Sequence, residues 1–132
     1  MKNIDPFDPI KEYVLDYFSF LVTKYDFKQG VIEENEDYLA ITYSADLVDV
    51  VIYYEFFNNY LQIRLIEKMK NGQDIIHTLD QLLKANGIPP IKQHFTTLAL
   101  DRKYFKDLIK EYSNYLMNMG GKVLNGDFSL FY

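Results

Sequence analysis

Residues 48–67 read VDVVIYYEFFNNYLQIRLIE, two runs of alternating side chains with an Asn-Asn pair between them. The two-residue repeat is typical of half-buried strands, and an Asn-Asn pair tolerates the positive φ of a tight hairpin. We therefore expect strands over residues 48–57 and 60–67. A two-residue loop between them would place Phe57 opposite Tyr60, Tyr54 opposite Ile63, and Tyr53 opposite Arg64.

The alternation assigns the side chains of this hairpin to two faces. One face is apolar enough to be the core and carries Val50, Ile52, Tyr54, Phe56, Leu61, Ile63 and Leu65. The other face mixes rings with charge and carries Val51, Tyr53, Glu55, Phe57, Tyr60, Gln62, Arg64 and Ile66.

Upstream of the hairpin, the apolar residues first have the spacing of a helix. Asp8 is a helix N-cap, Pro9 fits the first helical position, and apolar residues recur every three or four positions as far as Tyr25. We expect this helix to end before residues 28–30, where Gly30 supplies a turn. From residue 31 the period becomes two, which predicts a first strand there, an acidic turn over residues 33–37 and a second strand over residues 38–43.

Downstream of the hairpin two helices are expected. The first runs from about residue 74 to 86 and stops at Gly87, and an irregular connection through Pro89 and Pro90 follows. The second starts near Asp101 as N-cap and carries an apolar stripe to Met119, where two glycines end it. The tail over residues 123–128 is apolar enough to dock back on the domain.

This order predicts a single α+β domain over residues 1–132. Its architecture would be an N-terminal helix, a four-stranded antiparallel meander, then two further helices packed on one face of the sheet. The predicted core includes Leu21, Ile52, Tyr54, Leu61, Ile63, Leu65, Leu108 and Tyr112.

Charge, cysteine content and apolar patterning exclude or disfavour several classes of function. The net charge of -5 disfavours nucleic acid and anionic membranes as partners, whereas a basic protein partner is compatible with it, as is acidity serving solubility alone. The chain contains no cysteine, which excludes disulfides and thiolate sites. It shows neither a signal-peptide pattern nor an apolar run long enough to span a bilayer, so we expect a cytoplasmic protein.

No catalytic or metal motif is recognisable. His77, on the polar flank of the short helix, and His94, in the connection, have no patterned partner, so both are expected to face solvent or to be incidental. The acidic turn lacks the ligand spacing of a calcium loop, and no serine lies in a nucleophile elbow. We expect no metal, no cofactor and no enzymatic activity, although two carboxylates could still meet in space.

The mixed face of the hairpin is the candidate site. Tyr and Arg are enriched at interface hot spots, so Tyr53, Phe57, Tyr60 and Arg64 form a candidate partner-binding surface. The alternative is that a helix or the C-terminal tail covers this face, or that the rings line a solvated sheet with Arg64 paired to Glu55.

Four segments carry a resemblance to a known group. Tyr25-Asp26-Phe27, then Tyr43, then residues 50–55 (VVIYYE) and finally residues 124–128 (LNGDF) make the chain similar to small bacterial immunity-type proteins. The resemblance implies a cytoplasmic inhibitor, encoded beside a polymorphic or contact-dependent toxin, that blocks the toxin by binding it. It carries over no functional residue.

Two hypotheses follow. The first is an immunity-like protein whose acidic or aromatic surface occludes a toxin domain. The second is a small-molecule-binding or enzymatic domain with a pocket between sheet and helices. The identity of the toxin and the oligomeric state do not follow from the residues.

Overall fold

The computed structural model describes residues 8–55, 60–93 and 102–132 of the chain. Its fold is α+β, as the sequence predicts. The helices and strands in order are α1 (Asp8–Tyr17), α2 (Phe20–Thr23), β1 (Lys28–Glu34), β2 (Tyr38–Ser44), β3 (Val48–Glu55), β4 (Tyr60–Glu67), β5 (Ile75–Thr78), α3 (Leu79–Ala85), α4 (Arg102–Met119), α5 (Gly121–Leu124) and the 3-10 turn η1 (Ser129–Phe131).

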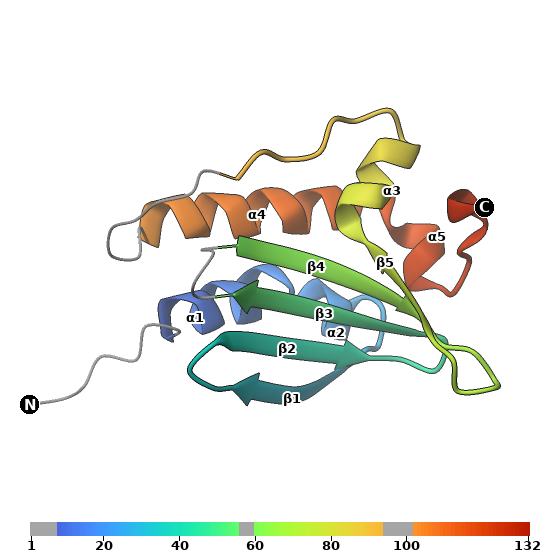
Figure 1. Cartoon of the computed structure of the whole chain (residues 1–132), viewed down its shortest axis with the longest axis horizontal. Helices are drawn as coiled ribbons and strands as arrows, with labels where there is room; N and C mark the ends of the chain where they lie inside the picture. The colour runs from blue at the N-terminus through green and yellow to red at the C-terminus, as the bar shows by residue number, and fades with distance from the viewer. Residues whose placement is uncertain (1–7, 56–59, 94–101) are drawn as a thin grey trace, which may run out of the picture.

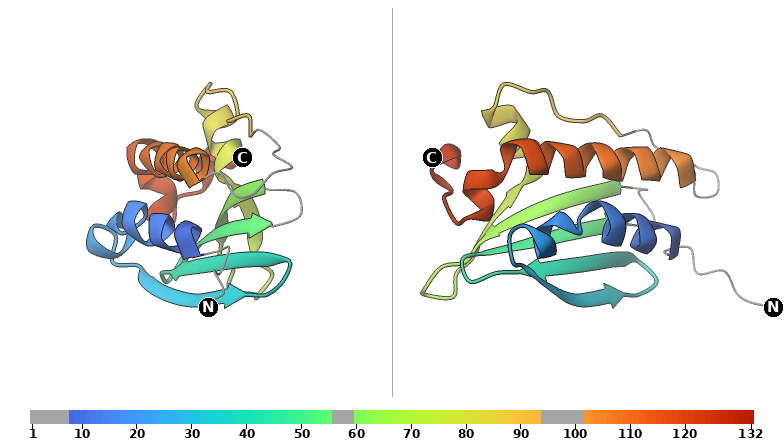
Figure 2. Two further views of the ribbon diagram at one scale, coloured as in Figure 1. Left: turned by 90° about the vertical axis from the view of Figure 1, so that its left-hand side faces the viewer. Right: turned by 180° about the vertical axis from the view of Figure 1, so that it is seen from behind.

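The strands form one antiparallel sheet in the order β1-β2-β3-β4-β5. The meander therefore has a fifth strand beyond the four that the sequence predicts. Figures 1 and 2 show α1, α2 and α4 together on one face of the sheet, with α1 and α4 side by side. We call the opposite face of the sheet the outer face.

The predicted core is confirmed. Each of its eight residues is buried, and the apolar stripe of α4 packs onto the same cluster. One contact between the layers joins Tyr54 of β3 to Phe105 of α4, whose ring centroids lie 5.1 Å apart at 85°. This edge-to-face geometry favours the attraction between the two rings, in addition to their burial.

The predicted register of the central hairpin is wrong by two residues. Glu55 lies opposite Tyr60 and Tyr54 opposite Leu61, so four residues rather than two separate the paired strands. The observed register aligns Ile41, Ile52 and Ile63 in one row across three strands. Such a row packs continuously against the helices, and this packing is invisible to an argument from the turn alone.

The predicted helix over residues 74–86 is wrong in its first half. Ile75–Thr78 form β5 on the edge of β4, and α3 begins only at Leu79. The boundary is a capping box: the hydroxyl of Thr78 accepts from the Gln81 backbone N–H at 3.2 Å, and Gln81 Oε1 accepts from the Thr78 N–H at 2.9 Å. The Thr-x-x-Gln spacing of this box was the sequence signal for the true helix start.

Two boundaries near the N-terminus also differ from expectation. The first helix breaks between α1 and α2, where Ser19 Oγ donates to the Asp16 carbonyl at 2.9 Å. The turn into β1 uses Asp26, with φ of 58°, and Gly30 lies inside β1. A β-carbon on Gly30 would lie 2.7 Å from the Thr42 carbonyl oxygen, so the close approach of β2 at this bulge requires glycine.

A side chain substitutes for a strand beside β4. β5 pairs only with residues 64–67 of β4. Next to Leu61, Gln93 Oε1 accepts from the backbone N–H at 2.9 Å, and the Gln93 amide donates to the carbonyl oxygen of the same residue. The Gln93 amide also donates to the Tyr112 hydroxyl at 3.3 Å. These bonds tie the segment before α4 to the edge of the sheet and satisfy backbone groups that β5 does not reach.

Candidate binding surface on the outer face of the sheet

Three of the four predicted partner-binding residues lie on the outer face. Strand pairing places Tyr53 opposite Gln62, Arg64 opposite Val51, and Tyr60 opposite Glu55, all with side chains opposite to the core. Phe57 lies outside the described residues. Because side chains alternate with a period of two, the two-residue error in register left every side chain on its predicted face.

Arg64 is held by two neighbours on this face. Its guanidinium carbon lies 4.3 Å from the centroid of the Tyr53 ring, which is a cation–π contact. Its Nε donates to Gln62 Oε1 at 2.7 Å on the same strand. The sequence alternative pairs Arg64 with Glu55, whereas strand pairing places Arg64 opposite Val51 and Glu55 opposite Tyr60 at the far end of the hairpin.

Tyr38 extends the aromatic part of the surface and was not among the predicted site residues. Its ring centroid lies 5.3 Å from that of Tyr53, and its hydroxyl donates to Glu33 Oε1 at 2.8 Å. This bond to a carboxylate raises the pKa of Tyr38. The alternation of β2 already placed Tyr38 on the outer face, but only the pairing of β2 with β3 brings it to Tyr53.

Tyr60 belongs to the margin of the surface. Burial, and then the negative charge of Asp80, raises the pKa of Tyr60, while a hydrogen bond with Gln62 lowers it. Asp80 belongs to α3 at the edge of the sheet. The Tyr60 hydroxyl is therefore influenced both by Asp80 at the edge and by Gln62, which also bonds to Arg64.

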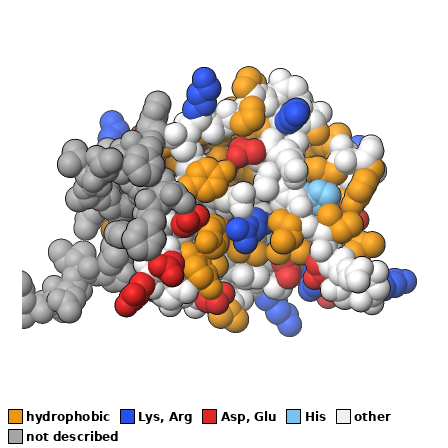
Figure 3. Space-filling model, in the orientation of Figure 1, with side chains coloured by type: hydrophobic (Ala, Val, Ile, Leu, Met, Phe, Trp, Pro, Cys, Tyr) orange, Lys and Arg blue, Asp and Glu red, His pale blue; other side chains and the backbone are white. Residues whose placement is uncertain are grey.

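Apolar side chains lie on the other side of Arg64. Val51 is directly opposite it, and Ile66 pairs with Ile76, whose side chain is 58% exposed. Figure 3 shows the molecule in the orientation of Figure 1, and hydrophobic, basic and acidic side chains are interspersed on the face that it presents. The surface thus combines a central cation with rings on one flank and aliphatic groups on the other.

The C-terminal tail docks on the helix side of the sheet and not on the outer face. His77 is opposite Leu65 on the core side of β5 and is 7% exposed, so the prediction of a solvent-facing residue is wrong. Its ring stacks on Phe131, with centroids 4.1 Å apart and planes at 17°, and on Phe128 at 5.3 Å. His77 was predicted on a helix, whereas it lies on β5, where alternation turns it toward the core. His94 lies outside the described residues.

Glu67 joins this C-terminal cluster to the end of β4. Its Oε1 accepts from the Tyr132 hydroxyl at 2.6 Å and lies 3.2 Å from His77 Nε2. The Tyr132 hydrogen bond, and then the contact with His77, lowers the pKa of Glu67. The same hydrogen bond raises the pKa of Tyr132. Both Tyr132 and His77 favour the ionised form of the Glu67 carboxylate. The hydrogen bond from Tyr132 also attaches the end of the C-terminal tail to β4.

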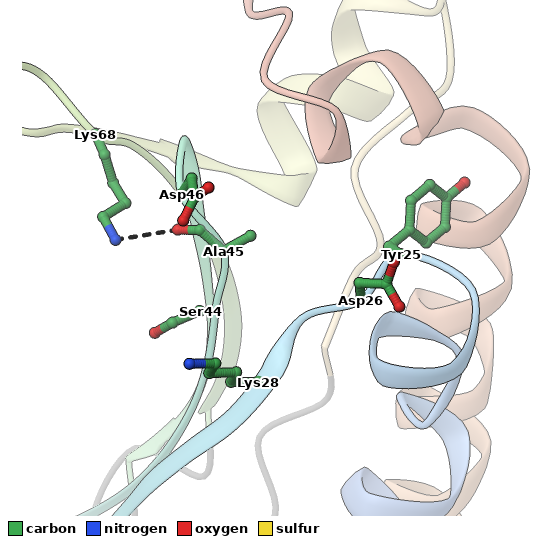
Figure 4. Close-up of a pocket in the computed structure, with 7 residues that line it drawn as sticks. All are labelled: Tyr25, Asp26, Lys28, Ser44, Ala45, Asp46 and Lys68. Carbon is green, nitrogen blue, oxygen red and sulfur yellow. Dashed lines mark hydrogen bonds between the residues drawn. The ribbon is translucent and has the colours of Figure 1, made fainter.

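A hollow of about 370 Å³ lies where the β2–β3 turn meets the entry to β1 (Figure 4). Lys28 and Lys68 line it together with Asp26 and Asp46. Lys68 Nζ donates to the Ala45 carbonyl at 3.1 Å and lies 3.5 Å from Asp49 Oδ1. Two cations and two anions in the wall leave no net charge with which to select an ionic ligand.

Two general properties complete the description. In the described ranges no group of three or more His, Asp or Glu residues could hold a metal ion. None of the helices in those ranges is long and apolar enough to cross a membrane. Comparison of the chain with family models, with curated proteins and with solved structures finds no match.

Proposed function

We propose that this protein is a non-catalytic binding domain that inhibits a bacterial toxin by covering it, as immunity proteins do, in the cytoplasm of the cell that makes it. The observation that carries the proposal is the arrangement of Arg64 over Tyr53, with Gln62 fixing the guanidinium from the side. Rigid rings and an oriented arginine are the groups that contribute most to binding energy at protein interfaces.

The sheet supports this use of the surface. Tyr53 and Arg64 lie on β3 and β4, two interior strands whose opposite faces are buried in the core. Side chains on such strands lose little further freedom when a partner binds, so more of the contact energy appears as affinity. The net charge of -5 favours association with a basic toxin domain and accelerates it.

The test uses the product of the neighbouring gene as the candidate toxin. We expect the wild-type protein to bind it in a pull-down and in calorimetry. Tyr53→Ala and Arg64→Gln should each weaken binding about ten- to a thousandfold, because truncating a hot spot costs about 1–4 kcal/mol.

Lys110→Ala is the matched control, because this exposed residue lies on α4 at the other side of the molecule. Its affinity should equal that of the wild type. Thermal unfolding of all three variants separates lost binding from lost structure. Full affinity in both Tyr53→Ala and Arg64→Gln would contradict the proposal for this surface.

A further inference from the structure

The guanidinium of Arg64 is held in one orientation, but most of its N–H donors make no hydrogen bond to the described residues. Of its five N–H donors, one on Nε is bonded to Gln62, and the ring of Tyr53 covers one flat side. Its terminal nitrogens bond to none of the residues that the structure describes. The residue is half-buried between Tyr53 and aliphatic neighbours, so a free pair of donors is presented in a fixed direction.

We infer that Arg64 is the receptor for a carboxylate of the protein partner, an Asp or Glu side chain flanked by apolar residues. The inference rests on the proposed function and names the chemistry of its site. Two terminal amino groups of a planar guanidinium match the two oxygens of a carboxylate in a bidentate pair. Stacking and the Nε hydrogen bond fix the guanidinium before the partner arrives.

The surroundings of Arg64 select this ligand. Val51 and Ile66 lie on the side of Arg64 away from Tyr53, and Ile76 beside Ile66 is 58% exposed, so apolar residues of a segment that extends in that direction can bury area there. Asp49 on this face is paired with Lys68 at 3.5 Å, so the negative field around the site comes from Glu33 and from the net charge of -5. That charge disfavours a phosphate dianion or nucleic acid but accepts one carboxylate carried on a basic segment.

The chain itself supplies a clean spectroscopic probe. Arg64 and Arg102 are its two arginines, so side-chain Nε–Hε spectra of protein labelled with ¹⁵N-arginine contain two signals. Arg102 begins α4 and serves as the internal control. The ligands are two peptides that differ in one group, acetyl-Lys-Ile-Glu-Ile-Lys-amide and the same peptide with Gln in place of Glu.

We expect the Glu peptide to shift the Arg64 signal in a saturable way and to leave the Arg102 signal in place. The Gln peptide should bind about tenfold more weakly, because it lacks the charge of the acceptor. Arg64→Lys, followed through backbone amides of β3 and β4, should lose most of this preference, because an ammonium keeps the charge without the fork.

Equal binding of the two peptides, equal shifts of both arginine signals, or no binding of either would overturn the inference. Undiminished preference for Glu in Arg64→Lys would overturn it as well. These outcomes are separable from the toxin experiment. A toxin that binds through Tyr53 and Arg64 while the peptides do not differ leaves the proposed function standing without the carboxylate. If the Glu peptide binds more tightly than the Gln peptide but the toxin does not bind, the carboxylate site stands and the proposed function fails.

Discussion

Arg64 stacks on Tyr53 at 4.3 Å, although the two residues are not opposite each other in the sheet. Arg64 lies opposite Val51, and the guanidinium reaches diagonally toward the end of the hairpin. Gln62, which is the residue opposite Tyr53, holds it there through Nε. The contact therefore depends on the length of the arginine side chain as much as on strand pairing.

The first prediction concerns the strength of this contact. In a double-mutant cycle of Arg64→Gln and Tyr53→Leu, we expect a coupling free energy of about 0.5–1 kcal/mol, typical of a cation–π pair that water still reaches. Urea denaturation of the wild type, both single variants and the double variant gives this value. A coupling of zero would show that the guanidinium is not held by the ring in solution.

The second prediction tests the two faces of the sheet with one residue type. Ile63 is 1% exposed on the core side, so Ile63→Ala should lower the free energy of unfolding by about 2–5 kcal/mol. Ile76 is 58% exposed on the outer face, and Ile76→Ala should change it by less than about 0.5 kcal/mol. Chemical denaturation measures both. Similar losses would mean that the faces are assigned wrongly.

The third prediction compares two buried tyrosine hydroxyls. Tyr43 is 1% exposed, burial raises its pKa to about 12, and its hydroxyl has no hydrogen-bond partner within the described part of the chain. Tyr43→Phe removes this unpaired group and should stabilise the protein by about 1 kcal/mol. Tyr112 donates to Asp80 and accepts from Gln93, so Tyr112→Phe should destabilise it by about 1 kcal/mol. Thermal denaturation of both variants checks the opposite signs.

The fourth prediction is a loss of stability in acid that depends on the chain terminus. The pKa of Glu67 lies below its ordinary 4.5, chiefly because the Tyr132 hydroxyl donates to the carboxylate. The folded state therefore holds this proton less tightly than the unfolded state. The resulting stability is complete above pH 4.5 and disappears as the pH falls through the folded value.

Tyr132→Phe isolates this contribution, because all other carboxylates titrate alike in both proteins. Urea midpoints of the two proteins should differ at neutral pH and converge as the pH falls below 4.5. A difference that is constant with pH would mean that the tyrosine stabilises the tail through ring contacts alone.

Several parts of the fold could be predicted because their signals are local. The alternation over residues 48–67 identified both central strands and their buried faces, and the apolar stripe before Gly120 identified α4. Of the candidate site, Tyr53, Tyr60 and Arg64 were assigned to the correct face in the same way. The start of α3 also has a local signal, the capping box of Thr78 and Gln81. It was not predicted because the preceding isoleucines were assigned to the helix.

What the sequence by itself determined is the face on which each residue of β3 and β4 lies. That property follows from a period of two, so it survives a register error of two residues. The tertiary structure alone decided which side chains meet: the addition of β5 to β4, the burial of His77 under the C-terminal rings, and the diagonal contact of Arg64 with Tyr53. Each joins segments whose alignment is set by packing between elements, and no local pattern records that packing.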